Sequence, residues 1–320
     1  MNRRSQKGMA LLLVLVVVAL LTSLLVDLGY STLVDMRLTE TFRDSTKAYY
    51  LAKGGINAGR MIVVMDKNQY DSKREAWSKG VANYPVGEGS VSIAIEDQDG
   101  KLALNALMIG NNPAAIMLDR FYRLLVLLEL DDEADPAELT AALIDWLDAD
   151  DVPFAEINTD NLSIPVTGAE SSYYRTLKEP YPCKNGPLET LEELTLVRGF
   201  TPELVRRVSP HLTVNGTMQV NINTASKAVL MSLDPAIDEN TANIIIDFRQ
   251  EQSISTIAQL EEILPTEIYA ILKTFANLKR LGTTSQIYRI ESTAQVNDGS
   301  RRLIAEINKD ENGLLFFKVN

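Results

Sequence analysis

The feature that most constrains this chain is an apolar run near its start. Eighteen uncharged residues, mostly leucine and valine, extend from Met9 to Val26, and Asp27 ends the run. As a helix this run would be about 27 Å long, close to the thickness of a bilayer core. The preceding residues include Arg3, Arg4 and Lys7 and no acid. Basic residues before a span predict that the N-terminus stays inside and that the rest of the chain is exported.

A cleaved secretory signal peptide is the alternative interpretation of the same run. Such a peptide usually has an apolar core of about 7–15 residues followed by a small-x-small cleavage site. The run here is longer, and the following Val26-Asp27-Leu28-Gly29 is a poor cleavage site. We therefore expect a retained membrane helix.

Composition narrows the classes of function. The 320 residues leave room for about two domains, and 46% hydrophobic with 23% charged residues rule out general disorder. The formal charge of −12 argues against a nucleic-acid-binding surface over most of the chain. Cys183 is the only cysteine and His211 the only histidine, which excludes an internal disulfide and any metal site rich in thiolates or histidines. We do not expect an enzyme.

The helix is predicted to continue beyond the membrane. No proline occurs before Pro85, and apolar residues at helical spacing resume at Ile56, after Gly54-Gly55. These patterns predict one long helix from Met9 to about Met65, interrupted or bent near the two glycines. Half of such a rod would lie in lipid and half would pack against a soluble head.

The remaining patterns predict an α+β protein. Residues 89–96 alternate as a half-buried strand, and Asp99-Gly100 predicts a tight turn into residues 101–107. Strand patterns return near the C-terminus at residues 285–296, 301–308 and 314–319, with a hairpin turn at residues 297–300. Between these two groups, from about Asn112 to Leu281, the pattern is helical. We therefore expect an antiparallel sheet module with a large inserted all-α domain.

The N-terminus carries a family resemblance. Lys7-Gly8-Met9-Ala10-Leu11-Leu12 resembles a type III prepilin leader, which implies cleavage after Gly8 by a prepilin peptidase and N-methylation of Met9. Most pilins have glutamate at the fifth mature position, where this chain has Leu13. In this it resembles the minor pseudopilin K family of type II secretion systems. A subunit at the tip has no neighbour's buried amine to neutralise, and an isolated carboxylate in an apolar bundle is costly, so Leu13 fits a tip position.

The resemblance implies a function and partners. It implies a minor pseudopilin at the pseudopilus tip that initiates or caps assembly for export of folded proteins across the outer membrane. The implied partners are the minor pseudopilins I and J, the major pseudopilin G, the prepilin peptidase and the inner membrane, with the soluble region periplasmic. The expected segments are a leader at 1–8, a transmembrane helix at 9–26, a pilin-like helix and first strands at 27–111, an inserted SAM-like helical domain at 112–282 and returning strands at 283–320.

An acidic segment is a candidate metal site. Glu129 to Asp151 contains ten acids and no base, and Asp148 and Asp150, at i and i+2 on a turn, can converge on one hard cation. The segment is not an EF-hand, because Pro153 stands where the loop needs glycine. A solvated acidic helix end is the alternative.

The resemblance extends to this segment. Asp145-Trp-Leu-Asp148-Ala-Asp150-Asp151, followed by Gly168-Ala-Glu170 and Tyr173-Tyr174, resembles the family's D-W-x-D-x-D and G-A-E signature. This signature implies structural Ca²⁺ with Asp148, Asp150, Asp151 and Glu170 as ligands, although the spacing from Pro153 to Gly168 is longer than in the family. Asp145 is expected to face outward from the preceding helix.

A second interpretation rests on residues 187–200 and 220–249, which resemble helix-hairpin-helix repeats. It would make the chain a membrane-anchored periplasmic DNA-binding or competence protein. However, the second hairpin, Leu233 to Asp238, lacks the glycines that approach phosphate. Residues 186–282 also contain twelve acids against eight bases. We therefore expect a structural use of the repeats and no nucleic acid as a partner.

Overall fold

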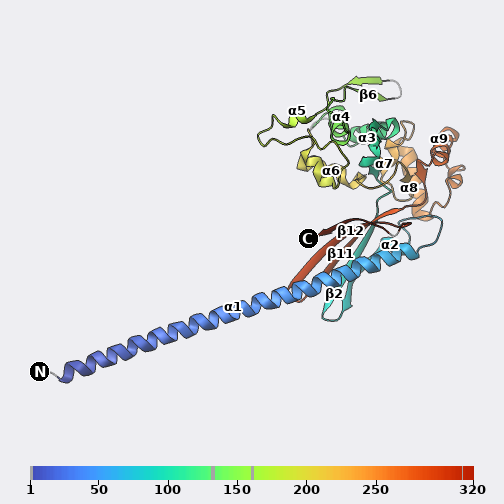
Figure 1. Ribbon diagram of the computed structural model, residues 1–320. Coiled ribbons are helices and arrows are strands. Elements are labelled where there is room, and N and C mark those ends of the chain that lie inside the picture. Colours follow the sequence, from blue (N-terminus) through green and yellow to red (C-terminus); the bar gives the residue numbers. More distant parts are fainter. Residues whose placement is uncertain (1–2, 131–133, 160–161, 312) are drawn as a thin grey trace.

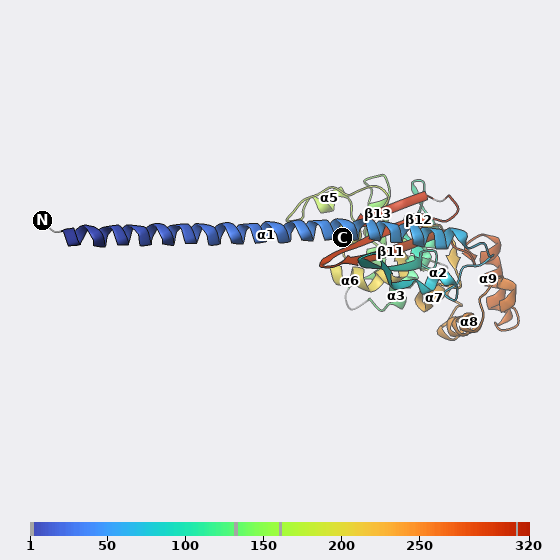
Figure 2. The same ribbon diagram turned by 90° about the horizontal axis from the view of Figure 1, so that it is seen from below.

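The computed structural model describes residues 3–130, 134–159, 162–311 and 313–320. Its most prominent element is α1 (Arg3–Met65), a rod that projects from the folded part of the molecule (Figures 1 and 2). Residues 9–43 of α1 are exposed, and packing against the sheet begins at Asp44. The apolar start of the helix is long enough to cross a membrane. Residues 1–2 of the predicted leader lie outside the described part of the chain.

α1 passes through Gly54-Gly55 without interruption, so the predicted break there is wrong. The glycines serve close packing instead. A Cβ built at Gly55 would lie 2.1 Å from Ser292 Oγ, and one built at Gly59 would lie 2.7 Å from a methyl group of Ile290. These positions let the helix backbone approach the sheet, and this contact offsets the low helix propensity of glycine.

The sheet has five antiparallel strands in the order β1-β2-β11-β12-β13. Their bounds are β1 (Val81–Val86), β2 (Gly89–Asp97), β11 (Ile287–Val296), β12 (Gly299–Asn308) and β13 (Gly313–Val319). A short helix, α2 (Ala76–Lys79), connects α1 to β1. α1 packs on one face of the sheet, where Ile56, Val63, Ile93 and Leu303 form part of a buried core. This confirms the α+β class and the returning C-terminal strands.

The inserted domain leaves the sheet at Asp97 and returns at Ile287. The insertion predicted at 112–282 lies inside the segment between these two strands. Of residues 101–107, which follow the predicted turn at Asp99-Gly100, only Leu102–Ala103 (β3) is extended, and it pairs in parallel with β8 (Leu212–Thr213) inside the domain.

The domain is mainly helical, with short two-stranded ladders, and lies beyond the end of the sheet farthest from the N-terminus (Figure 1). Its helices are α3 (Ala115–Leu127), α4 (Pro136–Leu147), α5 (Ser171–Tyr174), α6 (Pro202–Val208), α7 (Lys227–Ser232), α8 (Glu239–Glu251) and α9 (Thr266–Asn277), with 3₁₀ turns η1 (Leu104–Leu107), η2 (Leu191–Leu196), η3 (Ser209–His211) and η4 (Ile257–Leu260). Its other strands are β4 (Met108–Ile109), β5 (Asn112–Pro113), β6 (Glu156–Thr159), β7 (Leu162–Pro165), β9 (Val220–Asn221) and β10 (Leu281–Gly282).

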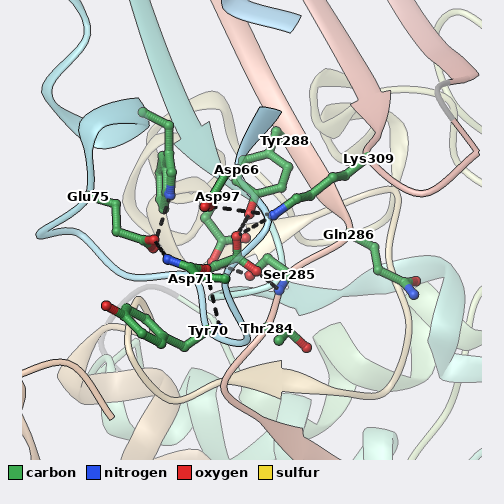
Figure 3. A network of polar contacts seen from close by, with 12 residues as sticks. Asp66, Tyr70, Asp71, Glu75, Asp97, Thr284, Ser285, Gln286, Tyr288 and Lys309 are labelled. Atoms are coloured by element: carbon green, nitrogen blue, oxygen red, sulfur yellow. Dashed lines mark hydrogen bonds and ion pairs between the residues drawn. The ribbon is translucent and has the colours of Figure 1, made fainter. Parts of the chain in front are cut away.

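A buried polar network joins the domain to the sheet, and Figure 3 shows its members Asp71, Asp97 and Ser285. Asn221 Nδ2 donates to the backbone oxygen of Asp71 at 2.9 Å, to Asp97 Oδ2 at 3.2 Å and to Ser285 Oγ at 2.7 Å. Asp97 Oδ2 also accepts from the hydroxyls of Ser285 and Thr224, while burial raises the pKa of Asp97 to about 7. Hydrogen bonds among Asp97, Asn221 and Ser285 therefore join the start, the middle and the end of the insertion.

Candidate metal centre

Three acidic side chains meet inside the helical domain. Asp145 lies in the last turn of α4, Asp148 caps the C-terminus of that helix, and Glu170 precedes α5. The exposed fractions of these residues are 0%, 8% and 1%. One carboxylate oxygen from each lies within 4.8 Å of the others. This arrangement concentrates negative charge in a site removed from water.

The hydrogen bonds of the described residues leave most of this charge unsatisfied. Asp145 Oδ1 accepts from Phe154 N at 2.7 Å. Asp145 Oδ2, Asp148 Oδ1 and both Glu170 oxygens have no partner among the described atoms. Burial, followed by repulsion from neighbouring acids, raises the pKa of Asp148 and of Glu170 to about 7. Burial raises the pKa of Asp145 to about 6. Carboxylates in such a setting need a cation or a proton.

The β6–β7 hairpin accounts for the long stretch of sequence between α4, which carries Asp145 and Asp148, and Glu170. β6 and β7 pair in antiparallel register, and the pairing continues as Val166 N donates to Ala155 O at 3.0 Å and Gly168 N to Phe154 O at 2.9 Å. The two ends of this hairpin, Phe154 and Gly168, therefore lie side by side next to Asp145. A Cβ at Gly168 would lie 1.8 Å from Asp145 Oδ2, so only glycine fits beside the acids.

Two of the four predicted metal ligands are buried in the structure and two are exposed. Asp148 and Glu170 belong to the buried group, as does Asp145, so the expectation that Asp145 faces outward is wrong. Apart from Glu138, every residue of α4 is buried, so this helix has almost no outward face. Asp150 and Asp151 are exposed, and Asp150 Oδ1 accepts from Val152 N at 2.8 Å. The i, i+3 spacing of Asp145 and Asp148, neighbours on one helix face, is the signal that was missed.

The donor set fits a hard cation. Calcium binds carboxylate oxygens at about 2.3–2.6 Å, so two oxygens on one ion can be up to about 5 Å apart. One oxygen from each of the three carboxylates lies within 4.8 Å of the others, close enough for all three to contact one ion. The adjacent Cys183 thiol donates to Asp145 O at 3.3 Å, and burial raises its pKa to about 12. A neutral thiol is a poor metal ligand, so the site offers oxygen chemistry.

In a second acidic group, a lysine side chain balances the charge of the carboxylates. Asp66, Asp71 and Glu75 also place carboxylate oxygens within 4.8 Å of one another. Figure 3 shows Lys309 reaching this group, and its Nζ lies 2.8 Å from Asp71 Oδ1 and 3.6 Å from Asp66 Oδ2. Here the chain supplies its own cation, so this group is not our candidate metal centre.

Comparison with known proteins places the chain in a family. Residues 100–217 and 220–270 match sequence profiles described as "Type II secretion system (T2SS), protein K". Together these matches span more than half of the chain. The chain belongs to the type II secretion system protein K family. It is accordingly a minor pseudopilin of type II secretion, and the DNA-binding alternative receives no support.

Relatives and a solved structure agree with this family. The chain is 29% identical over 235 residues to protein K of Pectobacterium carotovorum, covering 70% of this chain and 68% of that protein. It is 24% identical over 320 residues to protein K of Aeromonas hydrophila, covering 94% and 92%. It also resembles a chain in the GspK–GspI–GspJ complex from enterotoxigenic Escherichia coli, with a TM-score of 0.69, 17% identity and coverage of 88% and 99%. At that identity, the structural match shows the shared fold.

The predicted processing residues of this protein K family member lie at the start of α1. Gly8, Met9 and Leu13 belong to one continuous helix. Met9 and Leu13 are 69% and 65% exposed. Cleavage after Gly8 and methylation of Met9 remain predictions.

Proposed function

We propose that this pseudopilin is the tip subunit of the secretion pseudopilus and assembles there with the minor pseudopilins I and J. The observation that carries the proposal is Leu13 on an apolar helix whose first 35 residues after Gly8 are exposed. A helix without the usual carboxylate cannot neutralise the buried amine of a subunit above it. The solved complex of GspK with GspI and GspJ supports the choice of partners.

The exposed part of α1 supports assembly with further helices. About 25 Å of α1 separates the end of the apolar run from the sheet, and its exposed apolar residues are Leu28, Tyr30, Leu33, Val34, Met36, Leu38 and Phe42. Such residues need apolar neighbours. We assign the run at 9–26 to the inner membrane, with the sheet and helical domain periplasmic. The following segment would pack against the helices of I, J and the major pseudopilin G.

Co-purification tests the partners. Full-length protein in detergent, produced together with the I and J subunits of the same system, should yield one complex containing all three. Single substitutions in the exposed segment, such as Phe42→Asp, should weaken it, whereas Leu278→Asp, at an exposed position after α9 in the helical domain, should not. Failure to recover I and J with the unmodified chain would contradict the proposed assembly.

Substitution of Leu13 tests the tip position. Leu13→Glu should insert into the membrane, because a carboxylate near a helix end reaches the interface or binds a proton. It should not improve secretion, since a tip subunit has no amine above it to pair. Leu12→Glu is the control for inserting an acid one residue away. A clear gain in assembly specific to Leu13→Glu would place the subunit within the shaft.

We also propose that the buried acids hold a structural Ca²⁺. Asp145, Asp148 and Glu170 would supply the buried ligand oxygens, and the exposed Asp150 and Asp151 would add negative charge beside them. Ca²⁺ would offset the repulsion among the carboxylates and so stabilise the helical domain. The unpartnered, buried oxygens support this proposal.

Thermal unfolding of the full chain in detergent tests the metal. Ca²⁺ should raise the midpoint above that with chelator, and Mg²⁺ should raise it less, because Mg²⁺ demands a tighter octahedral shell and keeps its waters. Asp148→Asn should remove the Ca²⁺ effect, while Glu203→Gln, at an exposed position on α6, should retain it. Equal midpoints with Ca²⁺, Mg²⁺ and chelator would contradict a Ca²⁺ site.

A further inference from the structure

Arg198 contacts both ends of the segment that carries Glu170. Its guanidinium donates from Nη1 to Gly168 O at 3.1 Å, and from Nη2 to Thr167 O and to the Glu138 carboxylate. The guanidinium carbon lies 5.4 Å from the centre of the Tyr173 ring. The side chain is only 21% exposed. Two guanidinium nitrogens therefore reach three separate acceptors while the group lies over an aromatic ring, and a lysine ammonium does not reproduce this planar, forked set of contacts.

The backbone of Arg198 adds a contact on the far side of Glu170. Arg198 N donates to Tyr174 Oη at 3.2 Å. Residues 167–168 and 173–174, on either side of Glu170, are thus held by a single residue.

The same guanidinium connects this segment to α4. Glu138 lies on α4 two turns before Asp145. Between α4 and Glu170 the chain runs out and back through the β6–β7 hairpin, so proximity in sequence does not place the Glu170 carboxylate. Arg198 thus bridges Glu138 and residues 167–168, beside a direct hydrogen bond from Thr167 N to Glu138 Oε1 at 3.3 Å.

We propose that Arg198 is a positioning residue for the metal centre. It holds residues 167–174 against α4, so that the Glu170 carboxylate lies beside Asp145 and Asp148 before an ion binds. The proposal rests on the proposed Ca²⁺ site. Contacts that orient metal ligands typically change metal affinity by about 10–100-fold when removed.

Positioning and simple charge balance predict opposite results. The hydrogen bonds of Arg198 go to backbone oxygens and Glu138, not to the unpartnered oxygens of the three acids. A cation that acted only through its charge would repel Ca²⁺, so its removal would tighten binding. Loss of a positioning contact weakens binding instead. The sign of the change in affinity therefore separates the two roles.

Calorimetric titration of Ca²⁺ into the full chain in detergent provides the first test. Arg198→Gln should weaken binding by about tenfold. Arg198→Lys should weaken binding similarly, because lysine retains the positive charge but lacks the two guanidinium nitrogens that donate these hydrogen bonds. Arg206→Gln, an exposed arginine on α6, is the matched control and should bind as the unmodified chain does. Unchanged or tighter binding in Arg198→Gln, or full rescue by Arg198→Lys, would overturn the proposal.

A thermodynamic cycle tests whether Arg198 acts through Glu170. With Glu170→Gln already present, Arg198→Gln should change the Ca²⁺ affinity by less than about twofold, since coupled residues are not additive. A tenfold loss persisting in that background would overturn action through Glu170.

Hydrogen exchange without metal separates this proposal from the Ca²⁺ site itself. With chelator present, backbone amides of residues 167–174 should exchange faster in Arg198→Gln than in Arg206→Gln. Equal exchange would overturn the positioning role. If the unmodified chain binds no Ca²⁺, the metal proposal fails, and the exchange comparison alone decides the role of Arg198.

Discussion

The ammonium group of Lys309, in the turn between β12 and β13, lies 2.8 Å from Oδ1 of Asp71, in the link between α1 and α2. Asp71 is 2% exposed, and the same oxygen accepts from the Tyr288 hydroxyl. Asp71 Oδ2 accepts from Ser285 N at 2.7 Å, where the chain returns to the sheet. One buried carboxylate thus joins three distant segments, and Lys309 supplies its countercharge.

Lys309→Gln should therefore destabilise the protein strongly. Removing one partner of a buried ion pair leaves an uncompensated charge and costs about 3–5 kcal/mol. Lys318→Gln is the control, because Lys318 pairs with Glu192 at the surface, where such pairs contribute less than about 1 kcal/mol. Denaturant unfolding of both variants measures the difference. Equal, small losses would mean that Lys309 does not neutralise Asp71.

Adjacent glycines in α1 should respond in opposite directions to alanine. Gly55→Ala forces a methyl group against Ser292 and should destabilise the packing of helix on sheet by about 1–3 kcal/mol. A Cβ at Gly54 meets nothing within 4 Å, so Gly54→Ala should stabilise the helix by up to about 1 kcal/mol. Denaturant unfolding of the two variants compares them directly. A stabilising Gly55→Ala would contradict the close approach of α1 to β11.

The fold could be predicted where patterns are local. The apolar run, the alternation of the C-terminal strands and the turn at Asn297, whose φ is 47°, are all readable from neighbouring residues. The predicted break at Gly54-Gly55 is wrong because it rests on the low helix propensity of glycine alone. The close contact with Ser292, which requires glycine at position 55, comes from a strand far away in sequence. The point at which the chain leaves the sheet is also set non-locally, because Asp97 pairs with Tyr288 of β11.

The metal centre was only partly predictable for the same reason. The acidic turn and Glu170 are visible as a motif, but the orientation of Asp145 depends on α4 being buried on nearly all sides. The roles of Arg198 and Lys309 have no local signal, since each is defined by partners that lie far from it in sequence. Sequence alone does not distinguish an acidic group that contacts a lysine from one left without a cation.

Processing should depend on Gly8. Gly8→Asp should block cleavage, because peptidases of the prepilin type need a small residue before the cut. Intact-mass measurement of the membrane-purified protein should show a chain starting at methylated Met9, and the variant should retain Met1 to its aspartate. Cells lacking the peptidase provide the control. An unmodified chain that retains its first eight residues in cells with active peptidase would contradict the leader assignment.

The effect of Ca²⁺ on stability should depend on pH in a defined direction. The folded pKa values of about 6 for Asp145 and about 7 for Asp148 and Glu170 exceed the unfolded values near 4. Without metal, the folded chain therefore binds more protons than the unfolded chain between about pH 4 and 7. This contribution to stability is fully present below about pH 4 and is lost as the pH rises through the folded pKa values.

Calcium requires the deprotonated carboxylates, so its contribution runs in the opposite direction. At about pH 8, Ca²⁺ at a hundredfold excess over Kd should add about 2.7 kcal/mol to the free energy of unfolding. At the same Ca²⁺ concentration and about pH 5.5, protons compete for all three acids, and the addition should fall below about 0.5 kcal/mol. Denaturant unfolding with Ca²⁺ and with chelator at both pH values measures this. Asp148→Asn should show almost no Ca²⁺ effect at either pH, and an increment of the same size at both pH values in the unmodified chain would mean that Ca²⁺ binds outside this group of acids.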